Sequence, residues 1–285
     1  MKRWVSIIVG LVAIFAVVFA LNYSLKLKRN PDKYVYSNTP TLFIHGYGGT
    51  LNSTKDLVRA AEKSGAAKKM LTARVTKDGH VKLSGHWDKN RFNPMVQIVF
   101  SDNRNTDYQT DAKWIKNVVV ALQHKYGIKS FNAVAHSMGN LGLMTYEMTY
   151  GQDKSLPKLR KQVAIAGHFD GIVGLDKQVS DNHLDGLGKP EKTVSYYDWL
   201  LSRQDNYPKN QVDVLNIYGD LDDGTHSDGR VSTTSAKSLQ YLLGDRPKSY
   251  QERLISGPEA QHSKLHENNQ QVNHAMIDFL WGRTK

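Results

Sequence analysis

Short apolar runs alternate with helix-forming segments along most of the chain. The runs TLFI, MVQIVF, FNAVAH and VDVLNIYG are each followed by a polar or glycine-containing turn. Uninterrupted apolar runs bounded by turn signals are typical of parallel strands buried on both faces. The segments between them repeat apolar residues at helical spacing, as in DAKWIKNVVVALQHKYG. This alternation predicts an α/β fold with a mostly parallel central sheet and helices on both faces.

The same patterns assign further elements. Residues 71–85 alternate around Lys77-Asp78-Gly79, which is typical of a β-hairpin. A helix is expected where a Ser or Thr cap precedes apolar residues at helical spacing. Strands are expected at 161–168 and 250–257, and helices at 53–65, 138–149, 233–244 and 273–283.

The amino-terminal segment is apolar and flanked by positive charge. Lys2 and Arg3 precede an uncharged stretch from Trp4 to Leu25, and basic residues follow it. About 20 apolar residues are needed to cross a bilayer. Residues 1–25 are therefore predicted to be a hydrophobic helix that is either a cleaved signal peptide or a retained membrane anchor. Both alternatives place the rest of the chain at the extracellular face of the membrane or in secreted form.

We expect residues 26–37 to be a linker and residues 38–285 to be one domain. Within that domain, residues 168–210 are irregular, polar and rich in glycine, and they would be an insertion over the carboxyl ends of the strands, where open α/β sheets bind ligands. Its apolar residues suggest two alternatives, a lid that shapes an acyl pocket or ordinary core packing. They are Ile172, Val173, Tyr196, Tyr197, Trp199 and Leu200.

Composition excludes some classes of function. The chain has 38 Lys and Arg against 27 Asp and Glu, a formal net charge of +11, but the basic residues are scattered and no nucleic-acid-binding motif is present. We therefore expect association with a membrane or an anionic cell envelope, and no nucleic acid partner. The absence of cysteine excludes disulfides, thiolate metal sites and cysteine nucleophiles. No cofactor is expected, and no metal, because the acidic cluster at 220–228 does not match the EF-hand spacing.

Ser137 stands between an apolar run and a helix-forming segment, in AVAHSMGN. Small residues flank it at two positions before, Ala135, and two positions after, Gly139. A turn this tight is typical of a nucleophile elbow, although glycine is commoner than alanine at the earlier position. The alternative is a serine that only caps a helix.

A serine hydroxyl is a weak nucleophile unless a base and an orienting acid lie beside it. On a strand-to-helix scaffold of this kind the chain order is Ser, acid, His. His262 follows the last predicted strand and is the favoured base, with His266 as the other candidate. Asp228 is the favoured acid, because a return toward the sheet follows it, and Asp220 is the alternative.

Acyl transfer also needs donors for a developing oxyanion. The segment HGYGG after the first buried strand offers the backbone N–H of Tyr47, and the N–H of Met138 directly follows the candidate nucleophile. A glycine-rich turn without a ligand is the alternative.

Four segments together resemble the α/β-hydrolase superfamily over residues 38–283. They are TLFIHGYGGTLNS, AVAHSMGN, NIYGDLDDGTHSDGRVS and QHSKLHEN. Within the superfamily they look like the uncharacterised secreted or cell-surface hydrolases of Gram-positive bacteria, and AHSMG is similar to the form found in small bacterial lipases. The resemblance implies the α/β-hydrolase fold, a triad of Ser137, Asp228 and His262, and an oxyanion hole of Tyr47 and Met138.

These residues predict a serine hydrolase that acts on a small-molecule ester or acylated substrate through an acyl-enzyme, as esterases and lipases do. One alternative is an envelope acyltransferase or thioesterase with the same triad. Another is a non-catalytic surface protein that binds a ligand on a hydrolase scaffold.

Overall fold

An eight-stranded sheet runs through the residues that this computed structural model describes, which are 29–88, 92–177 and 181–283. The strand order is β3-β2-β4-β1-β5-β6-β7-β8, and every neighbouring pair is parallel except β2 with β3. The predicted mostly parallel sheet is therefore confirmed. The strands are β1 (Thr41–Ile44), β2 (Lys68–Val75), β3 (Val81–Gly85), β4 (Pro94–Phe100), β5 (Ser130–His136), β6 (Lys158–Ile165), β7 (Asp213–Asp220) and β8 (Ser249–Ser256).

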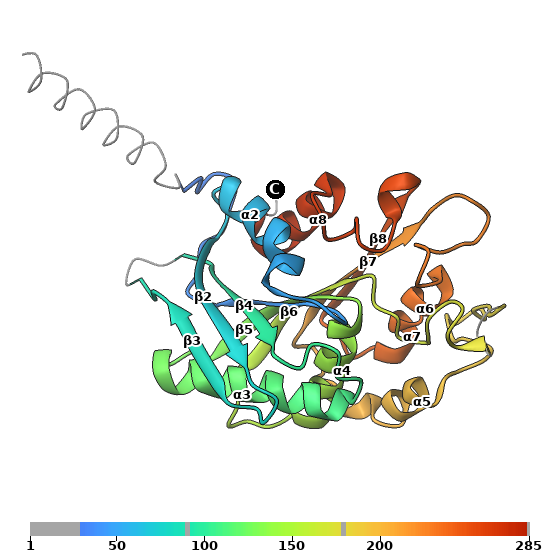
Figure 1. The fold of residues 1–285 in the computed structure, drawn as a ribbon, viewed down its shortest axis with the longest axis horizontal. Coiled ribbons are helices and arrows are strands. Elements are labelled where there is room, and N and C mark those ends of the chain that lie inside the picture. The colour runs from blue at the N-terminus through green and yellow to red at the C-terminus, as the bar shows by residue number, and fades with distance from the viewer. Residues whose placement is uncertain (1–28, 89–91, 178–180, 284–285) are drawn as a thin grey trace, which may run out of the picture.

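Helices cover both faces of the sheet, as the sequence predicts. Figure 1 shows α2 and α8 on one face and α3, α4 and α5 on the other. Each layer has its own apolar core against the sheet, around Leu57 and Val272 on the first face and around Val118 and Leu143 on the second. The helices are α2 (Lys55–Lys63), α3 (Tyr108–Tyr126), α4 (Met138–Tyr150), α5 (Ser195–Leu201), α6 (Thr233–Lys237), α7 (Leu239–Leu243) and α8 (Gln270–Trp281), with 3-10 turns at η1 (Leu51–Thr54), η3 (Gln204–Asn206) and η4 (Pro258–Ala260).

Local signals explain where the helices and the hairpin stop. The Asp107 side chain accepts a hydrogen bond from Gln109 N–H and begins α3, and Gly127 ends it with a φ of 67°. The β2–β3 hairpin turns through Gly79, whose φ is 84°. In both places the predicted turn residue occupies a backbone conformation that other residues rarely adopt.

The segment 233–244, predicted as one helix, is two short helices, α6 and α7, which meet at Ser238. The Ser238 hydroxyl donates to Ser235 O at 2.7 Å, while the Ser238 backbone stays right-handed, with a φ of −59° and a ψ of −16°. A serine that bonds locally to the backbone competes with the helical pattern. The apolar spacing could not reveal this break.

The amino-terminal part of the chain is described from Arg29 onward, so the predicted signal peptide or anchor at residues 1–25 lies outside the described residues. Among the residues that are described, none of the helices combines the length and the apolar content needed to cross a bilayer. Part of the stretch 26–37, predicted as a linker, packs on the domain. Tyr34 is 1% exposed and pairs with Gly282 in an isolated antiparallel bridge beside the end of α8.

The candidate site residues follow the carboxyl ends of the parallel strands. Ser137 directly follows β5, Tyr47 lies in the loop after β1, and Asp228 and His262 lie in the loops after β7 and β8. Because parallel strands end at the same edge of the sheet, these loops meet there. The fold thus gathers residues from four separate loops at one place.

Candidate active site

Ser137 lies in a strained turn between β5 and α4. Its φ is 50° and its ψ is −125°, a conformation that non-glycine residues rarely adopt. The turn is held by a hydrogen bond from Ser137 N–H to Ile165 O at 2.9 Å. The side chain is not a helix cap, since it accepts no hydrogen bond from the first turn of α4. This conformation lifts the hydroxyl away from the sheet, as expected of a nucleophile elbow.

Small residues around the turn are a steric requirement. A Cβ placed on Gly46 would lie 2.9 Å from the Cβ of Ser137, and one on Gly139 would lie 2.7 Å from His45 O. Ala135, where glycine is commoner, is completely buried in β5. Its single methyl group is therefore accommodated, while larger residues at 46 or 139 would displace the turn.

The structure brings Ser137, His262 and Asp228 into one hydrogen-bonded chain. His262 Nε2 lies 2.9 Å from Ser137 Oγ, and His262 Nδ1 lies 2.7 Å from Asp228 Oδ2. A carboxylate can only accept, so Nδ1–H donates to Asp228 and Nε2 is left to accept the Ser137 proton. This arrangement can remove a proton from the serine hydroxyl and return it to a leaving group.

Asp228 is held rigidly in this position. Its carboxylate is 1% exposed at the side chain, and its Oδ1 accepts hydrogen bonds from Arg230 N–H at 2.9 Å and Val231 N–H at 2.7 Å. A further bond from His262 N–H to Asp228 O at 2.9 Å ties the two loops together. The second oxygen is thereby directed at the imidazole alone.

The alternative acid and base do not belong to this hydrogen-bonded chain. Asp220, the last residue of β7, accepts a hydrogen bond from Asp222 N–H and lies 3.5 Å from His226 Nδ1. His266 packs its ring on His136 rather than on Ser137, with the ring centroids 4.1 Å apart. The distances therefore favour Asp228 over Asp220 and His262 over His266, a choice that their positions in the chain left open.

Two backbone N–H groups beside Ser137 have no acceptor among the described residues. Met138 is the first residue of α4, and a helix leaves its first N–H groups without an intrahelical partner. Tyr47 N–H lies in the glycine loop after β1, where its neighbours Gly48 and Gly49 donate to Asn103 O and Gly46 O. Both Tyr47 and Met138 line the cavity at Ser137, so these donors are available to a ligand oxygen.

His45 fixes the loop that carries Tyr47. Its Nε2 accepts a hydrogen bond from Phe100 N–H at 3.1 Å, so Nδ1 carries the proton and donates to Gly46 O at 2.8 Å. The ring also fills the space in which a Cβ of Gly49 would lie. Burial lowers the pKa of His45, which keeps it neutral and holds this tautomer.

Three further histidines surround His262, and of these the sequence suggested only His266 for the site, as an alternative base. His136, His168 and His266 all line the cavity. The ring centroid of His136 lies 4.9 Å from that of His262, and its Nε2–H donates to His262 O at 3.2 Å. His136 directly precedes Ser137, so the sequence shows that it lies beside the turn. Its contact with His262 depends on the fold and could not be predicted from the sequence.

These imidazoles are uncharged near neutral pH. Burial, with the neighbouring imidazoles, holds the pKa of His136 well below its ordinary value and lowers that of His168 to about 4. Burial also lowers the pKa of His266. His262 is therefore surrounded by neutral rings. Among the described residues, no group of three His, Asp or Glu side chains has the arrangement needed to hold a metal ion.

A cavity of about 890 Å³ opens at Ser137. Part of the inserted segment lines it through Ile172, Val173 and Leu175, and the last two of these side chains are exposed. Other apolar residues of the segment face the core: Tyr197 and Leu200 of α5 are completely buried, and Tyr196 donates a hydrogen bond to Leu141 O. Trp199 packs against the same core. One end of the segment therefore lines the cavity, and the other end packs in the core.

The model of a protein family matches residues 28–283, and that family is described as alpha/beta hydrolase of unknown function (DUF915). This match covers the sheet, the helices and every candidate site residue. No curated protein is similar enough in sequence to this chain to count as a match.

Solved structures agree with the fold. The product of the Listeria innocua gene lin2722 is 28% identical, with a TM-score of 0.78 over 86% of this chain and 94% of that chain. A candidate cell surface hydrolase of Lactobacillus plantarum is 20% identical, with a TM-score of 0.68 over 85% and 89%. The propeptide form of Bacillus licheniformis lipase BlEst2 is 11% identical, with a TM-score of 0.53 over 90% and 53%. The last two likenesses concern the fold alone.

Proposed function

Because this chain belongs to the family of α/β hydrolases of unknown function whose model it matches, we propose that it is a serine hydrolase that cleaves carboxylic esters through an acyl-enzyme intermediate. The observation that carries the proposal is the pair of hydrogen bonds linking Ser137 to His262 and His262 to Asp228. In this proposal Ser137 is the nucleophile, His262 is the general base and then the general acid, and Asp228 orients the imidazole.

Acylation and deacylation use the same groups. Ser137 Oγ attacks the ester carbonyl while its proton passes to His262 Nε2, and the imidazolium then protonates the departing alcohol. Water, deprotonated by His262 Nε2, attacks the acyl-enzyme, and Ser137 regains its proton as the carboxylic acid leaves. Asp228 stays ionised throughout and stabilises the imidazolium.

The oxyanion of each tetrahedral intermediate accepts hydrogen bonds from Tyr47 N–H and Met138 N–H. Their lack of acceptors among the described residues supports this role. Such donors stabilise the transition state more than the ground state, and losing one costs about 2.7–4 kcal/mol. His45 contributes indirectly, because it holds the loop that presents Tyr47.

The cavity suggests the kind of ester. Ile172, Val173 and Leu175 form an apolar wall beside Ser137, so the acyl group is proposed to be apolar and to lie along the inserted segment. Apolar pockets with a few polar groups are the usual form of small-molecule sites. The substrate is thus a small-molecule ester or acylated compound.

We also propose that the enzyme works outside the cytoplasmic membrane, either anchored or secreted. The uncharged stretch from Trp4 to Leu25 with its basic flanks supports this location. The description of the Lactobacillus plantarum neighbour as a candidate cell surface hydrolase is consistent with it.

Replacement of the serine tests the proposal. Ser137→Ala should lower kcat/KM for short p-nitrophenyl esters by about 10⁴-fold or more, because no other hydroxyl contacts His262 Nε2 in the described residues. The melting temperature should change little, since the hydroxyl makes no structural hydrogen bond. Initial rates and thermal unfolding are measured on the same preparations.

A fluorophosphonate probe provides an independent measurement. It should label the parent protein on Ser137 and leave the variant unlabelled. A folded parent that neither labels nor hydrolyses esters would instead be a binding protein on a hydrolase scaffold. If an added alcohol captures the acyl group in preference to water, the enzyme is an acyltransferase with the same triad.

A further inference from the structure

The edge of the sheet opposite the candidate active site is strongly basic. A groove of about 640 Å³ runs along the amino ends of the parallel strands, and we call it the basic groove. The one carboxylate among the described residues that line it is Asp213, at the start of β7. Its basic residues precede or begin β5, β6 and β8 and are Lys129, Lys158, Arg160, Lys161 and Lys248.

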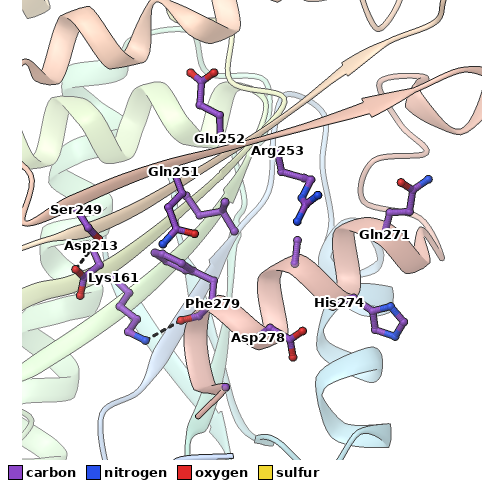
Figure 2. Close-up of a pocket in the computed structure, with 13 residues that line it drawn as sticks. Lys161, Asp213, Ser249, Gln251, Glu252, Arg253, Gln271, His274, Asp278 and Phe279 are labelled. Atoms are coloured by element: carbon purple, nitrogen blue, oxygen red, sulfur yellow. Dashed lines mark hydrogen bonds between the residues drawn. The ribbon is translucent and has the colours of Figure 1, made fainter. Parts of the chain in front are cut away.

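Two of these five residues are engaged within the protein. Lys161 donates to Phe279 O at 2.7 Å and to Leu280 O at 3.0 Å at the end of α8, and Figure 2 shows the first of these bonds. Lys248 Nζ lies 3.5 Å from Asp213 Oδ2. These contacts hold the Lys161 and Lys248 ammonium groups against the protein, so they are less able to contact an external partner.

Lys129, Lys158 and Arg160 are different. All three are exposed, and none forms an ion pair within the part of the chain that the structure describes. They therefore present uncompensated positive charge. The neighbouring groove between β8 and α8, drawn in Figure 2, has mixed charge instead, since Glu252 and Asp278 line it together with Arg253.

The chain joins the domain beside this groove. Val35 N–H donates to Trp281 O at 2.8 Å, and both residues line the groove. Val35 is only ten positions after Leu25, the last residue of the uncharged stretch (35 − 25 = 10). Even a fully extended chain of that length spans at most about 35 Å. The groove is therefore confined near the amino-terminal apolar segment, while Ser137 lies at the far edge of the sheet.

We propose that the basic groove docks on the anionic headgroups of a lipid bilayer and that the candidate active site consequently faces away from the membrane. Lysine and arginine near an anionic bilayer each strengthen binding by roughly fivefold, so three free cations contribute on the order of 100-fold. Lipid is favoured over a soluble polyanion because the uncharged segment 4–25 is tethered to the groove's rim. Docked in this way, the domain receives its substrate from the side away from the bilayer.

The absence of native cysteine makes the orientation measurable. The full chain, with a single fluorophore on Ser155→Cys or on Leu187→Cys, is reconstituted into vesicles of phosphatidylcholine with or without phosphatidylglycerol, and a headgroup nitroxide lipid serves as quencher. Ser155 is exposed in the loop that leads to β6, on the groove side, and Leu187 is 80% exposed in the inserted segment on the other side. With phosphatidylglycerol present, the label at 155 should be quenched several-fold more than the label at 187, and added salt should weaken the difference.

Charge variants identify the surface. Lys129→Glu/Lys158→Glu/Arg160→Glu should remove the difference between the two labels, and the corresponding glutamine variant should weaken it. The matched control is Lys82→Glu/Lys113→Glu/Lys192→Glu, which changes the net charge equally at exposed positions outside the groove and should keep the difference. Circular dichroism verifies the fold of each variant, and if the glutamate variant fails to fold, the glutamine variant decides.

Three outcomes would overturn the proposal. The two labels could be quenched equally, or the label at 187 could be quenched more. The control variant could lose the difference as fully as the groove variant. The third outcome is that polyphosphate binds through Lys129, Lys158 and Arg160 while neither label approaches the headgroups, which would assign the groove to an anionic polymer. None of these readouts uses ester hydrolysis, so they are independent of the proposed function.

Discussion

Ser137 occupies a conformation that its neighbours impose. The turn is closed by Ser137 N–H and Ile165 O, and Asn140 Nδ2 donates to both Ile165 O and Ser137 O. A backbone in this region stores on the order of 1–3 kcal/mol of strain, which persists only where surrounding contacts determine the geometry. Gly46 and Gly139 allow those contacts because neither carries a Cβ. The strained backbone of Ser137, the small residues around it and the exposure of its hydroxyl therefore all follow from the same tight turn.

The two candidate acids can be distinguished by isosteric substitution. Asp228→Asn should lower kcat by about 10⁴-fold, because the amide no longer holds His262 in the tautomer with a free Nε2. Asp220→Asn should change kcat less than tenfold, since its carboxylate contacts only its own loop and His226. Steady-state rates with one p-nitrophenyl ester compare the two. A larger loss at Asp220 would transfer the orienting role to that residue.

At the scale of the element, helix α4 contributes to the candidate site at its first turn and buries an acidic side chain at its last turn. Its first turn supplies Met138 N–H beside Ser137, and its last turn carries Glu147, which is 1% exposed. The Glu147 carboxyl group makes no hydrogen bond to any described residue, and its Oε2 is sealed from solvent. Burial raises the pKa of Glu147 to about 8. The helix therefore holds a protonated carboxylic acid at neutral pH.

This burial predicts how stability depends on pH. The folded state keeps the Glu147 proton up to about pH 8, because its pKa is raised there, while the unfolded chain releases the proton near the ordinary glutamate pKa of 4.5. The stabilisation is complete below pH 4.5 and is lost as pH rises through 8, at up to about 1.4 kcal/mol per pH unit in that window. Glu147→Gln removes this titration, so the variant should gain stability relative to the parent between pH 5 and pH 8, as urea unfolding measures. Parallel curves for the two proteins would contradict the assignment.

At the scale of the whole molecule, the sheet separates two edges with different chemistry. The carboxyl edge carries the cavity with its neutral histidines, and the amino edge carries the basic groove and the joined ends of the domain. Parallel strands cause this separation, because each of the seven parallel strands begins at one edge and ends at the other. A partner at the amino edge therefore leaves the cavity open.

The contact between the two ends of the domain should matter for stability. Tyr34 is a completely buried aromatic side chain in the core layer formed by α2 and α8. Tyr34→Ala should lower the free energy of unfolding by about 3 kcal/mol through lost burial and the cavity left behind. Val35→Ala, at a side chain that is 49% exposed, should lower it by less than about 0.5 kcal/mol. Urea unfolding of the full chain measures both, and equal effects would show that the Tyr34 contact is not stabilising.

The sequence by itself determined the elements and their order. Apolar runs and helical spacing are local properties, so strand 41–44 and a helix over 111–127, which is observed at 108–126, could be predicted, and with them the position of Ser137 at a strand end. At Ser238 the side chain bonds to the backbone, and the segment 233–244 that was predicted as one helix is two helices, α6 and α7.

Only the tertiary structure decided which residues meet. Ser137 and His262 are 125 positions apart, and their contact depends on parallel strands that deliver separate loops to one edge. The same packing selected Asp228 over Asp220 as the partner of His262, gathered His136, His168 and His266 around it, and aligned Lys129, Lys158 and Arg160 at the other edge. Chain position limits the candidates, but distance and burial in the folded molecule choose among them, because hydrogen bonds and charge interactions act across space rather than along the sequence.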